Sequence, residues 1–276
     1  IGSTALEIDS IDFDSRKITK GALFISQKGA VVDGHDYIHQ AIEKGAIAII
    51  CEELPSVCVD GIVYVVTSDA SGALGIMASN FYGNPSGQMV LVGVTGTNGK
   101  TTISSLLYQL FKGLGYPCGL ISTVKIQYQN KKLKNTHTTP DALTLNYHLS
   151  KMVEAGISHC FMEVSSHGIA QKRIHGLTFS GAIFSNLSHD HLDYHGDFKT
   201  YRDTKKLFFD FLPKSAFALT NIDDKNGAFM LQNTKAKKVS YAVKQYADYK
   251  AQILECQFSG MLLKIQDQEV WTSLVG

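Results

Sequence analysis

A glycine-rich turn between an apolar run and a helical pattern constrains this chain more than any other feature. Residues 90–94 are apolar and mostly β-branched, residues 95–99 hold two glycines, and residues 103–111 have helical periodicity. In a strand–loop–helix of this kind, backbone N–H groups and the helix N-terminus bind phosphate. Lys100 is then expected to reach the β- and γ-phosphates, and the Thr101 hydroxyl to bind Mg²⁺.

The turn departs from the strict phosphate-loop spacing, which requires glycine at position 94, where this chain has Val94. Glycines stand at positions 93 and 96 instead. A glycine-rich turn that binds no ligand is the alternative interpretation. The run Gly-Lys-Thr-Thr at 99–102, placed between a strand and a helix, favours phosphate binding.

The composition is that of a globular protein whose main partner is not nucleic acid. The chain has 276 residues, of which 44% are hydrophobic and 18% charged, and its formal net charge is +1. This length suits two domains or one large domain, and the balanced charge lacks the basic face that nucleic acid requires. No run approaches the roughly 18 apolar residues of a membrane span, and no signal-peptide pattern is present. The five cysteines form no C-x-x-C pair, so we expect reduced thiols and a cytoplasmic protein.

The apolar runs predict an α/β fold of two domains. The first, residues 1–86, is a small α/β domain with strands at 21–26, 46–50 and 62–66 and with helices that end at Gly45 and near Phe81. A breaker-rich segment at 82–87 marks the boundary. The second domain, residues 87–276, is expected to be a doubly wound, mostly parallel sheet like that of P-loop ATPases, which binds ligands at the carboxyl ends of its strands.

The second domain has two parts in this prediction. Its alternating part comprises strands at 89–94, 118–124, 159–165, 181–187 and 216–220 and helices at 101–113, 141–155 and 201–209. Beyond about residue 237 the pattern changes to short antiparallel strands at 251–255, 261–266 and 269–274.

Three polar clusters follow strands of the predicted sheet, at residues 163–168, 186–196 and 221–224. Glu163 ends its strand and is a candidate Mg²⁺ ligand, because Mg²⁺ prefers oxygen ligands. A solvated glutamate is the alternative. Lys205 lies in a predicted helix, where spacing alone does not distinguish it from a solvated lysine.

The second cluster contains three histidines, His189, His191 and His195, which together with Asp190 and Asp193 could hold zinc. The metallo-hydrolase pattern H-x-H-x-D-H is not met, because His195 stands two residues after Asp193 instead of next to it. A phosphate loop upstream does not fit a zinc hydrolase either. A role for His191 at a Mg²⁺–ATP site is therefore the favoured interpretation.

Together these segments resemble the ATP-dependent Mur ligases of peptidoglycan synthesis, and among them the MurE type, which adds the third amino acid of the stem peptide. Segment 95–102 (TGTNGKTT) is similar to the family's variant phosphate loop, which also accounts for Val94. Segments 14–16 (DSR) and 33–38 (DGHDYI) are similar to the N-terminal domain shared by the MurE and MurF types. Segments 163–168 (EVSSHG) and 190–196 (DHLDYHG) are similar to the MurE type specifically.

The resemblance implies a role for each of the following positions. The residues implied to bind ATP are Gly96, Thr97, Asn98, Gly99, Lys100, Thr101, Thr102, Asn221 and Asp224. Those implied to hold UDP-N-acetylmuramoyl-dipeptide are Ser15, Ala30, Val31, Val32, His137, Thr138, Thr139, Ser165, Gln171 and Arg173. The implied Mg²⁺ ligands are Thr101, Glu163, His191 and a carbamylated Lys205, and the implied catalytic residues are Lys100, Lys205 and His191. Contacts at 30–32 would rest on the backbone, because the side chains there are apolar.

The resemblance also implies a mechanism. The D-glutamate carboxylate of the substrate attacks the γ-phosphate of ATP to give an acyl phosphate and ADP, and the amine of the incoming amino acid then displaces phosphate. Meso-diaminopimelate is the expected amino acid, with L-lysine as the alternative. The family's third, Rossmann-like domain is expected to be absent here, so we expect weak ligand binding and no ligation by this fragment alone. We expect a monomer with neither nucleic acid nor a membrane as partner.

Three other interpretations stay open at this point. A zinc hydrolase would use the histidine cluster and would retain stoichiometric zinc. A non-catalytic nucleotide-binding module would bind an ATP analogue but no UDP-substrate. A folylpolyglutamate ligase shares the ATPase core, but the N-terminal segment 14–16 speaks against it.

Overall fold

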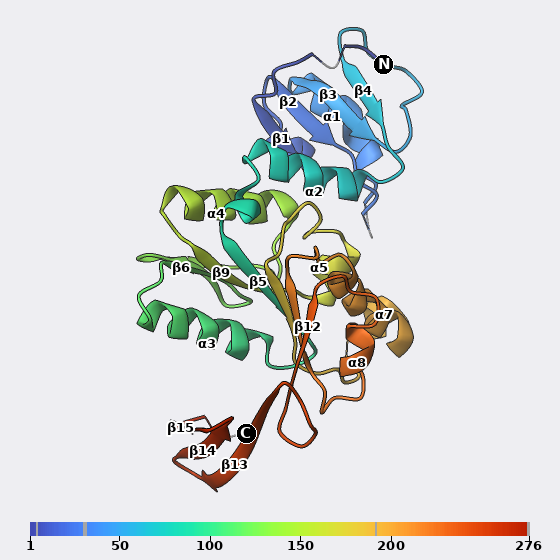
Figure 1. Cartoon of the computed structure of the whole chain (residues 1–276). Helices are drawn as coiled ribbons and strands as arrows, with labels where there is room; N and C mark the ends of the chain where they lie inside the picture. Colours follow the sequence, from blue (N-terminus) through green and yellow to red (C-terminus); the bar gives the residue numbers. More distant parts are fainter. Residues whose placement is uncertain (4, 30–31, 191, 275–276) are drawn as a thin grey trace. The chain divides into compact units, whose positions relative to one another are not determined.

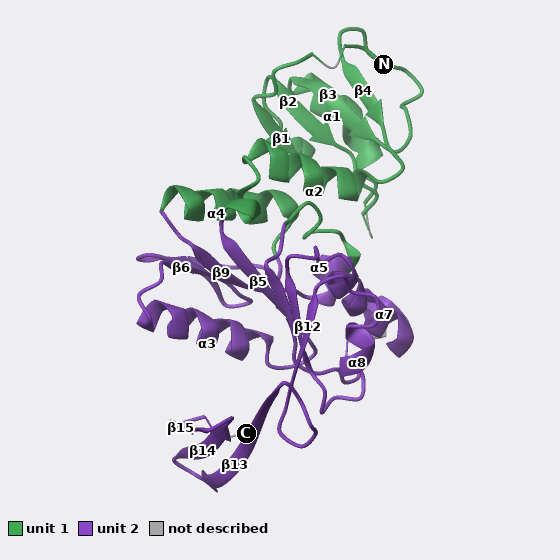
Figure 2. Cartoon of the chain, in the orientation of Figure 1, with its two compact units in different colours: residues 1–88, 140–155, 170–177 green, residues 89–139, 156–169, 178–276 purple. Residues whose placement is uncertain are grey.

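The computed structural model describes residues 1–3, 5–29, 32–190 and 192–274, and the chain divides into two compact units (Figure 1, Figure 2). Unit 1 comprises residues 1–88, 140–155 and 170–177, and unit 2 comprises 89–139, 156–169 and 178–276. A single boundary at 82–87 would assign the two later segments of unit 1 to the second domain. The division into independently folding domains stays a prediction.

Unit 1 contains a four-stranded parallel sheet in the order β1–β2–β3–β4. The strands are β1 (Ser10–Asp12), β2 (Ala22–Ile25), β3 (Ala46–Cys51) and β4 (Val63–Val66). The helices are α1 (Ile38–Glu43), α2 (Ala70–Phe81) and α4 (Ala142–Glu154), with 3₁₀ turns η1 (Ser15–Lys17), η2 (Gly34–Tyr37) and η3 (Pro85–Gln88).

The two central strands, β2 and β3, are covered on both faces, and they are accordingly apolar along their whole length. Leu23 and Ile25 of β2 lie in one apolar cluster with Leu74 of α2. Phe24 of β2 lies in a second cluster with Ile38 of α1. Successive side chains of β2 thus point to opposite faces, as strand geometry requires.

Unit 2 contains an eleven-stranded sheet in the order β15–β14–β13–β12–β11–β10–β5–β9–β6–β7–β8. Its strands are β5 (Val90–Thr95), β6 (Cys118–Ile121), β7 (Lys125–Tyr128), β8 (Lys131–Lys134), β9 (His159–Glu163), β10 (Gly181–Phe184), β11 (Phe217–Asn221), β12 (Lys237–Ala242), β13 (Tyr249–Gln257), β14 (Gly260–Ile265) and β15 (Gln268–Thr272). Its helices are α3 (Lys100–Gly113), α5 (Ser166–Ala170), α6 (Leu192–His195), α7 (Phe198–Asp210) and α8 (Gly227–Met230).

The strand order places β5 and β10 where the chain reverses its direction of winding. β5 pairs in parallel with β9 on one side and with β10 on the other. From β5 the chain continues to β6 and β9, and from β10 it continues away from them to β11 and β12. Ligands of open α/β sheets bind beyond the carboxyl ends of the strands at such a reversal.

Helices α3 and α7 cover opposite faces of this sheet (Figure 1). Val92 and Val94 of β5 share an apolar cluster with Tyr108 of α3. A Cβ added at Gly93, which points the other way, would collide with Phe208 of α7. Glycine at this position therefore lets α7 pack closely against β5.

The strands and helices predicted from the apolar runs are confirmed, with ends that differ by a few residues. The structure adds four strands that no pattern predicted, β1, β7, β8 and β12. The sequence pattern predicts that the parallel part of the sheet ends near residue 237. This is wrong, because β12 pairs in parallel with β11. Lys237–Ala242 mixes charged and apolar residues, so it lacks the apolar run of a buried strand. Antiparallel pairing in this half of the sheet begins between β13 and β14.

None of the helices among the described residues is both long and apolar enough to cross a membrane.

Candidate active site

The turn after β5 has the backbone geometry of a phosphate-binding loop. Gly96 has φ +148°, and a Cβ there would collide with the Ser185 hydroxyl. Gly99 has φ +85° and is the N-cap of α3, so the free N–H groups of the first helical turn follow it. Only glycine adopts such φ values readily, and therefore both glycines are required for the turn.

The departure at Val94 has a structural reason. Val94 is fully buried within β5 and pairs with Glu163 of β9, so the chain is still a strand at this position. The turn begins two residues later, at Gly96.

The loop at residues 96–99 is hydrogen-bonded to the segment that follows β10. The Thr97 N–H donates to the Asn186 carbonyl at 2.8 Å, and the Asn98 N–H donates to Asn186 Oδ1 at 3.0 Å. Ser185 Oγ donates to the Asn98 carbonyl at 2.6 Å. These three hydrogen bonds tie the loop to residues 185–186.

Two lysines meet at this loop. Lys100 Nζ donates to the carbonyls of Gly96 and Thr97, at 3.0 and 2.8 Å. Lys205 Nζ, on α7, also donates to the Gly96 carbonyl, at 2.9 Å, and lies 4.8 Å from the centre of the Tyr201 ring. Lys205 is only 1% exposed, so the alternative of a solvated lysine is wrong.

Burial lowers the pKa of both lysines. For Lys205 the pKa is well below the ordinary value, first because the amine is desolvated and second because Lys100 is close. For Lys100 desolvation lowers the pKa, while the carboxylates of Glu163 and Asp190 oppose this shift. The predicted ATP-binding lysine and the predicted Mg²⁺-binding glutamate are therefore electrostatic neighbours.

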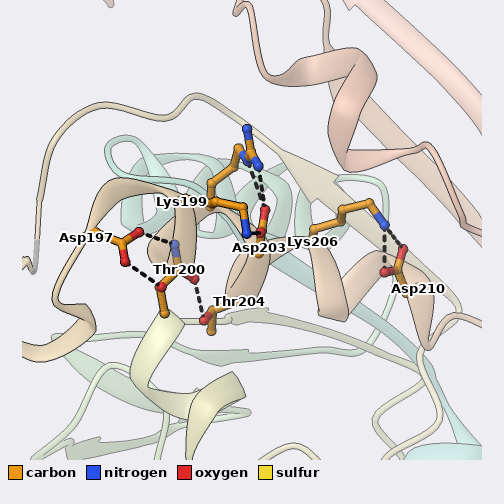
Figure 3. A network of polar contacts seen from close by, with 8 residues as sticks. Asp197, Lys199, Thr200, Asp203, Thr204, Lys206 and Asp210 are labelled. Atoms are coloured by element: carbon orange, nitrogen blue, oxygen red, sulfur yellow. Dashed lines mark hydrogen bonds and ion pairs between the residues drawn. The ribbon is translucent and has the colours of Figure 1, made fainter.

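Helix α7, which carries Lys205, also carries a network of polar contacts from Asp197 to Asp210 (Figure 3). Asp197 caps the helix by accepting from the Thr200 N–H at 2.8 Å. Lys206 forms an ion pair with Asp210, one turn further on, at 2.7 Å. Adjacent lysines thus have different environments, since Lys206 has an acidic partner and Lys205 contacts the phosphate loop.

Glu163 is fully buried at the end of β9. Its Oε1 accepts from the Thr123 N–H at 2.8 Å, and its Oε2 accepts from Thr123 Oγ1 at 3.1 Å. Since a carboxylate has about four acceptor positions, both oxygens retain lone pairs for a cation. The alternative of a solvated glutamate is wrong.

Three of the predicted substrate-binding residues lie next to Glu163 in unit 2. Thr139 Oγ1 donates to the Glu163 carbonyl at 3.0 Å and accepts from the Ser165 N–H at 2.9 Å. Thr138 Oγ1 accepts from Thr123 Oγ1 at 3.1 Å. His137 is exposed, and its ring contacts the neighbouring Thr136 hydroxyl.

Asn221 and Asp224 form hydrogen bonds to residues 185–187, in the segment that is bonded to the loop. Asn221 Nδ2 donates to the Ser185 carbonyl at 2.9 Å, and Asp224 Oδ2 accepts from the Leu187 N–H at 2.8 Å. A contact of either residue with a nucleotide stays a prediction.

The other predicted substrate-binding residues belong to unit 1. Ser15 is buried and donates to Gln40 Oε1 at 2.6 Å, whereas Val32 is exposed. Gln171 Oε1 accepts from Arg173 Nη2 at 2.6 Å. Three further predicted residues, Ala30, Val31 and His191, lie outside the described residues.

The described histidines of the cluster, His189 and His195, pack against aromatic rings. His189 packs on the Phe198 ring, with centroids 4.8 Å apart, and the buried His195 packs on Tyr201 at 5.3 Å. Among the residues that the structure describes, no three His, Cys, Asp or Glu side chains form a group that could hold a metal ion.

The donor set instead suits a divalent cation that is bound together with a nucleotide. Glu163 supplies a carboxylate with free lone pairs, and Thr101 opens α3 beside Lys100 with a hydroxyl. Hard oxygen ligands of this kind fit Mg²⁺, which otherwise keeps waters and phosphate oxygens. The amine of Lys205 fits only if it is converted into an oxygen ligand.

Sequence reasoning missed Thr123, Tyr201 and Asn186 as parts of this site. Tyr201 is fully buried, and its hydroxyl lies 3.2 Å from Thr97 Oγ1. Asn186 belongs to a polar cluster that the sequence analysis noted, but its contact with the loop spans 88 residues. No sequence signal marks Thr123, because it lies within the predicted strand 118–124 and threonine is common in strands.

Two family models match the chain. The Mur ligase middle domain matches residues 94–276, and the Mur ligase family catalytic domain matches residues 7–82. The UDP-N-acetylmuramoyl-L-alanyl-D-glutamate–2,6-diaminopimelate ligase of Parabacteroides distasonis is 51% identical over 276 residues, which are 100% of this chain and 57% of that protein.

Solved structures agree with these matches. One of a UDP-N-acetylmuramoyl-L-alanyl-D-glutamate–2,6-diaminopimelate ligase has a TM-score of 0.87 and 27% identity, covering 100% of this chain and 58% of that one. The MurF ligase of Thermotoga maritima in complex with ADP has a TM-score of 0.58 at 22% identity, covering 97% and 58%, which shows a common fold. The chain thus spans somewhat more than half the length of its curated relatives, at 57%. Because the middle-domain model alone matches residues 94–276, the chain belongs to the Mur ligase family.

Proposed function

We propose that this chain forms the UDP-substrate- and ATP-binding part of an ADP-forming ligase that adds meso-diaminopimelate to UDP-N-acetylmuramoyl-L-alanyl-D-glutamate. One observation carries the proposal: Lys100 and Lys205 both donate to the Gly96 carbonyl of a glycine-rich loop, and the Glu163 carboxylate acts electrostatically on Lys100. The chain is 51% identical, over its whole length, to a ligase of that name. L-lysine is the alternative amino acid. We expect the enzyme to be monomeric and cytoplasmic.

In the proposed reaction the chain mainly positions groups and neutralises charge. The loop N–H groups and Lys100 hold the triphosphate, so that the γ-phosphate faces the D-glutamate carboxylate of the substrate. Attack by that carboxylate forms an acyl phosphate and releases ADP, after which the amine of diaminopimelate displaces phosphate. The residues proposed to hold the muramoyl-dipeptide are His137, Thr138, Thr139, Ser165, Gln171 and Arg173. Ser15 is proposed to contact the UDP part of the substrate.

Mg²⁺, when bound by Thr101, Glu163 and the phosphate oxygens, would offset the negative charge of the triphosphate. Lys205 is proposed to join this set after carbamylation, in which its neutral amine takes up CO₂ and loses one proton. Two features of the structure support this step: burial favours the neutral amine, and the nearby Lys100 would pair with the resulting anion.

The test is ligation by purified full-length protein. ADP release should require UDP-N-acetylmuramoyl-L-alanyl-D-glutamate and diaminopimelate together, and removing bicarbonate should slow it. Replacing diaminopimelate with L-lysine decides between the two amino acids. Nucleotide binding without binding of the UDP-substrate would indicate the non-catalytic module instead. The 276 residues alone should bind ligands weakly and should not ligate.

A further inference from the structure

Thr123 lies between Glu163 and Thr138, two residues to which the proposed function gives different ligands. Its N–H and its hydroxyl hold the two carboxylate oxygens of Glu163, at 2.8 and 3.1 Å. The same hydroxyl also points to Thr138 Oγ1, at 3.1 Å. Thr123 is exposed, while Glu163 is fully buried, so the hydroxyl lies between the carboxylate and solvent.

A threonine hydroxyl has one proton to donate. The two contacts of the Thr123 hydroxyl therefore compete for this proton, since in both of them Thr123 is the donor. When the proton points to Glu163, it occupies a lone pair of Oε2 and offsets part of the carboxylate charge. When it points to Thr138, Oε2 is free for a cation, while the Thr123 N–H still orients the carboxylate through Oε1.

A ligand bound at Thr138 can favour the state in which the Thr123 hydroxyl donates to Thr138 over the state in which it donates to Glu163. A phosphate or carboxylate that accepts the Thr138 proton polarises that hydroxyl and makes its oxygen a better acceptor, because chained hydrogen bonds strengthen one another. The Thr123 proton is then drawn to Thr138 and away from Glu163. Thr139 keeps the geometry fixed meanwhile, since it joins the Glu163 carbonyl to the Ser165 N–H.

We propose that Thr123 is a positioning residue that couples anionic substrate at Thr138 to divalent-cation binding at Glu163. This inference rests on the proposed function, which gives Thr138 and Glu163 their ligands. Because linkage is reciprocal, the UDP-substrate should tighten cation binding by the same factor by which the cation tightens substrate binding. One hydrogen bond of ordinary strength corresponds to a factor of about 3–10.

The test uses Mn²⁺ as the probe and needs no turnover. Free Mn²⁺ is measured by electron paramagnetic resonance in titrations of the full-length protein, with and without UDP-N-acetylmuramoyl-L-alanyl-D-glutamate, and Mn²⁺ bound by the substrate alone is subtracted. In the wild type the substrate should lower the Kd of Mn²⁺ about 3–10-fold. Thr123→Val, which keeps the shape and the N–H, should bring this ratio to about 1, and Thr123→Ser should restore it.

Thr272→Val is the matched control, because it removes a hydroxyl in β15 that accepts from the Leu274 N–H. It should leave the ratio at the wild-type value. A Thr123→Val protein with the wild-type ratio, a Thr123→Ser protein without it, or a wild-type ratio of 1 overturns the inference while the proposed function stands. Absence of UDP-substrate binding to the wild type overturns both.

Discussion

The Nζ atoms of Lys100 and Lys205 donate to one backbone oxygen, the carbonyl of Gly96, at 3.0 and 2.9 Å. Two ammonium groups at one neutral acceptor would repel each other, and Lys100 accordingly lowers the pKa of Lys205 and favours its neutral amine. Burial adds to this cost, because water does not screen the pair fully. The arrangement is therefore better suited to an anion than to the free protein, as expected of a site that binds a triphosphate.

Lys100→Ala should abolish turnover and leave the fold intact. The ammonium that offsets charge on the transferred phosphoryl group is lost, and removing one such group typically lowers kcat by about 10²–10³ or more. The melting temperature should change little, because the variant loses two hydrogen bonds to loop carbonyls but also loses a desolvated amine. The measurements are ADP release and thermal unfolding of the full-length variant. Lys112→Ala, at an exposed site in the last turn of α3, is the control and should be fully active.

Lys205→Met should stabilise the protein in CO₂-free buffer, at the expense of activity. The pKa of Lys205 is lowered by burial and by Lys100, so the unfolded chain binds this proton more readily than the folded one. Stability of the wild type therefore rises with pH toward the ordinary lysine pKa of 10.5. The advantage of Lys205→Met should be greatest near pH 7 and should shrink toward pH 10, as measured by urea unfolding at each pH.

Lys206→Met is the matched control on the next residue and should have the opposite effect. Lys206 pairs with Asp210 at 2.7 Å, and the side chains are 8% and 23% exposed. Removing the ammonium leaves a partly buried carboxylate without its partner, which we expect to lower the free energy of unfolding by about 1–3 kcal/mol. Equal effects of the two substitutions would contradict the different environments of these lysines.

Gly96→Ala should destabilise the phosphate loop and prevent ATP binding. The residue has φ +148°, and an added Cβ would collide with the Ser185 hydroxyl, which itself holds the Asn98 carbonyl. Either the loop backbone or the Ser185 side chain must then shift. Calorimetric titration with a non-hydrolysable ATP analogue measures the loss. Gly87→Ala, where an added Cβ meets nothing within 4 Å, should bind the analogue like the wild type.

The phosphate loop could be predicted from sequence because all of its determinants are local. Gly96, Gly99 and Lys100 lie within five residues, and the strand and helix on either side have clear patterns. The environment of Lys205 could not be predicted in this way, since its bond to Gly96 spans 109 residues. Only the resemblance to the Mur ligases singled it out.

The surroundings of Glu163 could not be predicted from local sequence either. Its contact with Thr123 spans 40 residues and depends on β6 and β9 pairing side by side, which no local pattern specifies. Helix α4 is a second case. A helix over 141–155 is predicted from the sequence, but the pattern does not say which unit it packs in, and Leu143 lies in the core of unit 1.

Of the five cysteine thiols, two should react rapidly and three slowly. Cys58 and Cys256 are exposed, whereas Cys51, Cys118 and Cys160 are buried. Burial also raises the pKa of each buried thiol, most strongly that of Cys160, so little of the reactive thiolate is present. Ellman's reagent at pH 8 should therefore release two equivalents of thionitrobenzoate rapidly. The other three should appear only as the protein unfolds, at a rate that rises with urea concentration. A third fast equivalent in the wild type would contradict this burial pattern. So would any fast equivalent in the Cys58→Ser/Cys256→Ser double variant.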